Sequence, residues 1–189
     1  MEILVIGSSL ARQVVKTHDK YNEPIDSILF KGKMDLDFID RTMKNKNKQY
    51  RKIVYLSGND IIPTRLHKLN KFYSHVCLDK FDEVACINRY TSLVKILSFY
   101  TRNIIFCEPP PRATSVDIAS KCAFFDQRTA NRFRNVINSL KSGSNIGVLS
   151  NCTVLGFLNL TNSPLCASDQ IHFSRQAIGI IHKRLILEH

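Results

Sequence analysis

EILVIGSSLA, residues 2–11, decides the fold, because a strand, a tight turn and the start of a helix follow one another within it. Glu2 to Ile6 is a short run rich in β-branched side chains, and Gly7 ends it. The stretch from Leu10 to about His18 is compatible with a helix. A strand that passes directly into a helix is typical of an α/β protein with a parallel sheet.

The same alternation of strands and helices continues along the chain. Apolar patterns predict strands over 27–30, 51–56 and 103–107, a fifth strand over either 146–149 or 153–158, and helices over 34–43, 63–73, 81–100 and 126–140. Ser174 can N-cap a final helix that runs to Ile186. Such an order implies right-handed crossovers and a sheet covered on both faces. We therefore predict a three-layer α/β/α sandwich with about five parallel strands.

Length and composition fit a single domain. The chain has 189 residues and 44% hydrophobic content, which is enough to build a core between a sheet and its helices. We expect this domain to span residues 1–186, and residues 187–189 resemble a cloning remnant that enters a purification tag. The longest apolar runs are far shorter than the ~20 residues of a membrane span. No secretion signal precedes the first strand, so a cytoplasmic location is expected.

Cysteines and charge indicate the kind of partner rather than the chemistry. The six cysteines form no Cys-x-x-Cys pair and no Cys/His zinc pattern, so we expect free thiols, no metal and no cofactor. The net charge of +11 attracts polyanions such as nucleic acid or an anionic membrane. One basic cluster could bind phosphates, although such a run is more often a solvated face: Arg41, Lys44, Lys46, Lys48, Arg51 and Lys52. Ordinary surface positions are expected for His18, His67, His75 and His182.

Candidate catalytic residues lie where predicted strands end. In parallel sheets, sites form at the carboxyl ends of the strands, which directs attention to Ser9 after the first strand. A serine hydroxyl becomes a good nucleophile when a histidine takes its proton and a carboxylate orients that histidine. Asp169 and His172 stand three residues apart just before the final helix, a spacing that lets both side chains project toward one side. The sequence predicts a triad of Ser9, His172 and Asp169.

An ester hydrolase also needs donors for the oxyanion that forms in its tetrahedral intermediate. The backbone N–H groups of Ser9 and Gly32 and the side-chain amide of Asn59 all follow predicted strands and could supply three. At position 32, glycine lets the backbone approach a substrate closely. Arg112 follows the fourth strand, where either a contact to an anionic substrate group or a salt bridge beside the loop accounts for it.

These residues resemble the SGNH (GDSL-like) hydrolases, a family named for an invariant Ser, Gly, Asn and His in four sequence blocks. Counterparts of all four blocks occur in the right order: Gly7-Ser8-Ser9-Leu10 for the usual Gly-Asp-Ser-Leu, then Gly32, Gly58-Asn59-Asp60 and Asp169-x-x-His172. The resemblance covers residues 3 to about 186. Ser8 departs from the usual Asp, and we expect this change to tune activity rather than abolish it.

The resemblance implies a flavodoxin-like fold and a metal-free serine esterase acting on carboxylic esters, including lipids and acetylated substrates. Since no long insertion could form a lid or a deep acyl tunnel, short acyl groups such as acetyl are favoured. Two alternatives stay open: a lysophospholipase or thioesterase with a longer acyl preference, and a basic nucleic-acid- or membrane-associated module built on a hydrolase-like fold. Lys31-Gly32-Lys33 and Pro110-Pro111-Arg112 look similar to the esterase domains of non-LTR retrotransposon and related viral proteins.

Overall fold

A five-stranded parallel sheet forms the centre of the protein. The computed structural model describes residues 2–19, 25–31, 34–56, 64–69, 72–77, 83–107, 135, 140, 146–149 and 174–187. The sheet has the order β2-β1-β3-β6-β7, with β1 (Ile3–Gly7), β2 (Ile25–Leu29), β3 (Lys52–Leu56), β6 (Ile104–Cys107) and β7 (Ile146–Leu149). This is the flavodoxin-like order, and the fold class predicted from the sequence is confirmed. The fifth strand is the first of the two predicted segments.

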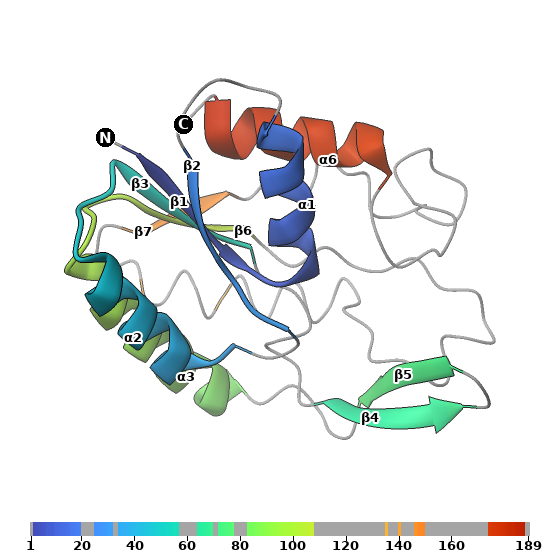
Figure 1. The fold of residues 1–189 in the computed structure, drawn as a ribbon. Helices are drawn as coiled ribbons and strands as arrows, with labels where there is room; N and C mark the ends of the chain where they lie inside the picture. Colours follow the sequence, from blue (N-terminus) through green and yellow to red (C-terminus); the bar gives the residue numbers. More distant parts are fainter. Residues whose placement is uncertain are drawn as a thin grey trace.

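Helices cover both faces of this sheet (Figure 1). α1 (Ser9–His18) and α6 (Arg175–His182) pack on one face, and α2 (Leu36–Lys46) and α3 (Glu83–Ser98) pack on the other. Alternate residues of β1 serve the two cores: Leu4 and Ile6 face α2 and α3, while Ile3 and Val5 face α1 and α6. A strand that is buried on both faces needs a continuous apolar run, which is why residues 3–6 are all apolar. The three predicted layers are present.

Side-chain caps define the starts of two helices. The Asp35 carboxylate accepts a hydrogen bond from the Phe38 N–H at 2.9 Å at the start of α2. The Ser174 hydroxyl accepts one from the Ala177 N–H at 3.2 Å at the start of α6, which confirms the predicted cap. A short π-helical segment, η4 (Lys183–Leu187), continues α6.

The segment predicted as a helix over 63–73 is a β-hairpin instead. β4 (Thr64–Leu69) and β5 (Phe72–Cys77) pair antiparallel in a separate two-stranded sheet, with Leu69 opposite Phe72. The residues Thr64, Tyr73 and Val76 favour strands, and only two residues separate the two runs in the sequence, a spacing typical of β-hairpins. The helix predicted over 126–140 lies almost entirely outside the described residues.

The structure describes the burial of two of the cysteines. Cys86 and Cys107 are buried, and neither forms a disulfide within the part of the chain that the structure describes. Among the helices that the structure describes, none combines the length and the apolar content required to cross a membrane.

Candidate active site

Ser9 lies at the turn between β1 and α1, at the carboxyl edge of the sheet. It is the first residue of α1, it is half-buried, and Ser8 before it makes no side-chain cap hydrogen bond. β1 lies between β2 and β3, so the direction in which strands are added reverses here. Ligands of open α/β sheets bind at such switch points, outside the carboxyl ends of the strands. The predicted nucleophile therefore occupies the position where this fold forms a site.

Gly7 makes this turn sterically possible. Its φ of +155° lies in a region that other residues rarely adopt, and a Cβ at this position would come within 2.7 Å of the Leu56 carbonyl oxygen and 2.9 Å of the Ala11 Cβ. The Gly7 carbonyl also accepts a hydrogen bond from the Phe30 N–H at 3.1 Å. The absence of a side chain thus lets the end of β1 pass between β3 and α1 and deliver Ser9 to the edge.

The N-terminus of α1 gives Ser9 an electrostatic setting suited to anionic intermediates. The first N–H groups of a helix have no acceptor within the helix, and the helix dipole places partial positive charge around them. The first helical hydrogen bond here runs from the Arg12 N–H to the Ser8 carbonyl at 3.0 Å. The Ser9 N–H precedes it and has no acceptor within the helix, and its role as an oxyanion donor stays a prediction.

The other predicted site residues, Gly32, Asn59, Arg112, Asp169 and His172, lie outside the described residues. The strands that precede three of these residues in the sequence show at which edge of the sheet each strand ends. β2, β3 and β6 come before positions 32, 59 and 112 in the sequence, and all are parallel to β1. Their carboxyl ends therefore lie at the same edge as Ser9.

An open groove of about 750 Å³ lies beside the turn that carries Ser9. It runs from the end of β2, where Leu29 pairs in register with Gly7, to Phe38 on α2 and Arg89 on α3. Its lining is mixed, with apolar Leu29 and Phe38 beside charged Lys31, Asp37 and Arg89. The volume is within the range of small-molecule sites. Sequence reasoning missed the groove, since Phe38 and Arg89 carry no motif and are far apart in the chain.

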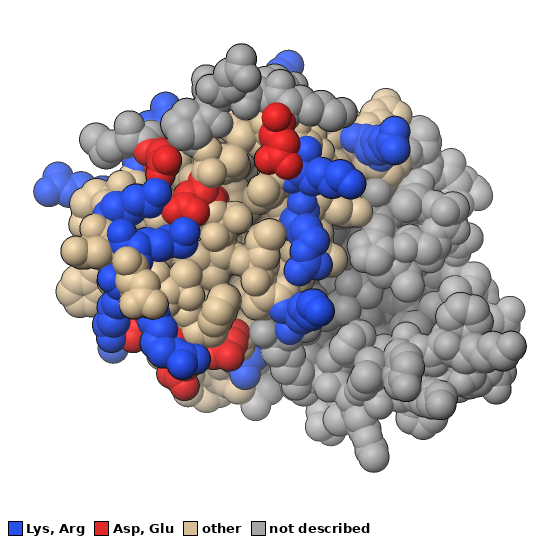
Figure 2. Space-filling model, viewed as in Figure 1, with Lys and Arg blue, Asp and Glu red and all other residues tan. Residues whose placement is uncertain are grey.

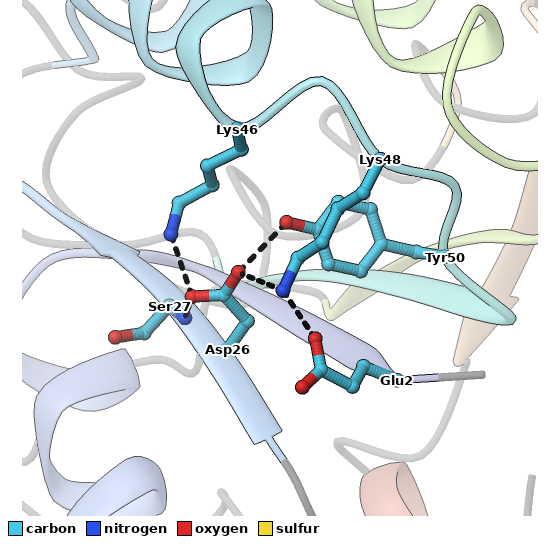
Figure 3. A network of polar contacts seen from close by, with 6 residues as sticks. All are labelled: Glu2, Asp26, Ser27, Lys46, Lys48 and Tyr50. Atoms are coloured by element: carbon cyan, nitrogen blue, oxygen red, sulfur yellow. Dashed lines mark hydrogen bonds and ion pairs between the residues drawn. The ribbon is translucent and has the colours of Figure 1, made fainter.

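A polar network around Asp26 occupies the opposite part of β2 (Figure 3). The Asp26 carboxylate accepts hydrogen bonds from Lys46 Nζ at 2.7 Å, the Tyr50 hydroxyl at 2.8 Å and the Ser27 N–H at 2.8 Å, and it pairs with Lys48. Partial burial favours a higher pKa for Asp26, but the bonds from Lys46, Tyr50, Lys48 and Ser27 outweigh it and hold the pKa far below its ordinary value. Burial and Asp26 itself raise the pKa of Tyr50.

The structure shows ion pairs within the basic cluster at 41–52, for which the sequence favoured a solvated face over a phosphate-binding surface. Lys46 and Lys48 pair with Asp26, and Lys48 also pairs with Glu2. Lys44 pairs with Asp40 one helical turn away at 2.6 Å. Ion pairs therefore neutralise Lys44, Lys46 and Lys48, and the pair of Lys44 with Asp40 lies at the surface.

Lys52 from the same cluster is fully buried rather than exposed. Its Nζ donates hydrogen bonds to the carbonyls of Leu185 at 2.8 Å and Ile186 at 3.3 Å in η4. Burial, with a smaller contribution from Arg51, lowers the pKa of Lys52 to about 8. Lys52 therefore anchors the last described helix to the central strand β3.

The expectation that His18 and His182 occupy the surface is wrong. Each is 1% exposed, and His18 Nδ1 lies 2.8 Å from His182 Nε2, which joins the ends of α1 and α6. Burial, followed by the proximity of His18, lowers the pKa of His182. A sequence signal existed, because His18 stands four residues after Val14 and His182 four after Ile178, on the apolar faces of their helices.

Comparison with known proteins identifies the fold and not the sequence family. Neither a protein-family model nor a curated protein sequence matches the chain. Solved structures match over nearly the whole length. An acetyl xylan esterase is 13% identical with a TM-score of 0.67, over 100% of this chain and 99% of its own.

Two further matched structures come from named bacteria. A GDSL-like lipase from Bacteroides thetaiotaomicron is 14% identical with a TM-score of 0.67, over 99% of this chain and 86% of its own. The acetylxylan esterase Axe2 from Geobacillus stearothermophilus is 14% identical with a TM-score of 0.58, over 99% and 93%. The chain therefore has the SGNH-like hydrolase fold. The narrower resemblance to retrotransposon and viral esterase domains gains no support from these structures.

Proposed function

We propose that this protein is a serine esterase that hydrolyses carboxylic esters through Ser9, His172 and Asp169. The observation that carries the proposal is the place of Ser9, which begins α1 at the switch point of a flavodoxin-like sheet. The steric requirement for glycine at position 7 supports it, because that turn brings Ser9 to the edge of the sheet. The fold shared with esterases and a lipase is the second support.

In the proposed mechanism, Ser9 Oγ attacks the ester carbonyl carbon while His172 takes the hydroxyl proton. The carbonyl oxygen becomes an oxyanion, which accepts hydrogen bonds from the backbone N–H groups of Ser9 and Gly32 and from the Asn59 amide. The intermediate expels the alcohol, which receives the proton from His172 and leaves an acyl group on Ser9. Water then attacks this acyl-enzyme with His172 as base, and the acid is released. Asp169 orients His172 throughout.

The proposed substrates are esters of short acyl groups, acetate above all, and Arg112 is the proposed contact for an anionic substrate group. Two matched structures are acetyl xylan esterases, which supports acetyl transfer to water. The groove at the carboxyl end of β2 favours a second candidate, a lysophospholipase or thioesterase, because its volume and its Leu29 and Phe38 lining admit a longer chain. A series of p-nitrophenyl esters from acetate to decanoate separates the two. Activity that rises with chain length would favour the second candidate.

Replacing the nucleophile tests the esterase directly. We expect Ser9→Ala to lower kcat for p-nitrophenyl acetate by at least about 1,000-fold, because no other group forms the acyl-enzyme. Ser8→Ala is the matched control, since the Ser8 side chain makes no cap hydrogen bond, and it should stay within about tenfold of wild type. A serine-directed organophosphonate should label wild type and Ser8→Ala at Ser9. Equal turnover by Ser9→Ala and wild type would refute the mechanism.

A further inference from the structure

The positive charge of this protein is distributed unequally between its two helical layers. α1, α6 and η4 contain no acidic residue, and together they carry Arg12, Lys16, Arg175, Lys183 and Arg184. On the other side of the sheet, α2 contains Asp37 and Asp40 among its basic residues, and Lys44 and Lys46 form ion pairs. α3 adds Arg89 and Lys95 against Glu83, so the α1 layer has the larger excess of basic residues, with the acidic Asp19 directly after α1.

Three exposed side chains on α1 and α6, which we call the cationic face, are Arg12, Lys16 and Arg175. None of them forms an ion pair with another residue in the part of the chain that the structure describes. Figure 2 shows Lys and Arg side chains in a column over α1. Their charges are therefore available to a partner.

The cationic face begins at the candidate site. Ser9, Arg12 and Lys16 follow one another at spacings of three and four residues, which places them along one side of α1. Arg175 opens α6 and follows His172 by three residues in the sequence. An anionic partner on this face would therefore border the reacting serine.

We propose that the cationic face docks on an anionic lipid bilayer, so that the enzyme acts on ester lipids held in that surface. The choice of a bilayer over another polyanion rests on the proposed esterase function, because a bilayer supplies both the negative charge and acyl esters. α1, α6 and η4 contain no Phe, Tyr or Trp, the side chains on which the bases of single-stranded nucleic acids stack.

The expected binding is electrostatic and additive over the face. Each Lys or Arg near an anionic membrane surface strengthens binding by about fivefold at physiological salt, and this contribution falls as salt rises. Reversing two of these charges in Arg12→Glu/Lys16→Glu should therefore weaken vesicle binding by at least about 20-fold. The milder Arg12→Gln/Lys16→Gln should show an intermediate loss, and it guards against misfolding of the charge-reversed protein.

The test is co-sedimentation of the full chain with vesicles of phosphatidylcholine alone or of phosphatidylcholine mixed with phosphatidylserine. The matched control is Lys95→Glu/Arg102→Glu, which changes the net charge equally at two exposed residues in or after α3. Ser9→Ala is measured in parallel, because it separates binding from hydrolysis. Circular dichroism reports that each variant is folded.

The proposal predicts that wild type and Ser9→Ala bind only vesicles that contain phosphatidylserine, and that the Arg12/Lys16 variants lose binding while the control keeps it. Failure of wild type to bind these vesicles, or equal loss in the control, would overturn the proposal. Tighter binding of poly(U) through Arg12 and Lys16 would also overturn it in favour of a nucleic acid. Full esterase activity in Ser9→Ala would instead refute the proposed function and leave the vesicle result to be judged by itself.

Discussion

The structure leaves no space for a side chain at Gly7. We expect Gly7→Ala to lower the free energy of unfolding by about 2 kcal/mol or more, because φ is unfavourable and the new methyl group would lie 2.7 Å from the Leu56 carbonyl oxygen. Urea denaturation measures this change. Gly179→Ala is the control, since apart from its chain neighbours and the backbone of its own helix no atom lies within 4 Å of the added Cβ, and it should be neutral or stabilising by up to about 1 kcal/mol. Similar values for both variants would mean that the turn relaxes freely.

The contribution of Asp26 to the stability of the fold depends on pH. Its pKa is lowered in the folded state, so its contribution is present above the ordinary carboxyl pKa of about 4 and is lost as the pH falls below it. Because the network is partly open to water, we expect Asp26→Asn to cost about 1 kcal/mol at neutral pH and to converge with wild type in acid. Asp40→Asn, which breaks only the exposed pair with Lys44, should change stability little. A constant difference between Asp26→Asn and wild type at all pH values would contradict this account.

The contact between α1 and α6 makes a second pH dependence. His182 has a lowered pKa, so the unfolded chain binds its proton more readily, and stability falls as the pH drops below the ordinary histidine pKa of about 6.5. His182→Gln can keep a hydrogen bond to His18 but does not titrate. We therefore expect its urea midpoint to change less than that of wild type between about pH 7 and about pH 5. An equal change of the urea midpoint with pH in the two proteins would show that protonation of the His18–His182 pair does not affect stability.

Strongly apolar elements were predictable, and one short element was not. β1 and β3 are buried on both faces, and this burial requires the continuous apolar runs from which they were predicted. In the hairpin β4–β5, Leu66, Leu69 and Tyr73 recur at spacings of three and four residues, which also suit a helix. The pairing between β4 and β5 determines the structure of this segment. The spacing of apolar residues along one segment does not show which other segment it pairs with.

Across the protein, the sequence predicted positions set by strand ends and missed those set by distant partners. Ser9 follows directly from the end of β1 and the parallel sheet. Lys52 looked like a surface charge, yet its acceptors Leu185 and Ile186 stand more than a hundred residues later. The same reason explains His18 and His182. The total charge of +11 likewise gave no sign that α2 holds Lys44 and Lys46 in ion pairs while Arg12 and Lys16 of α1 form none with the described residues.

The contacts of Lys52 also bring the first strand and the last described helix together. Lys52 pairs in register with Ile3 at the start of β1, and its Nζ holds the carbonyls of Leu185 and Ile186. The first strand and the last described helix therefore meet at the amino edge of the sheet, and Figure 1 marks both chain ends on that side. Ser9 lies at the opposite edge. This geometry suits circular permutation and insertion within a host polypeptide, because flanking chain would attach far from Ser9.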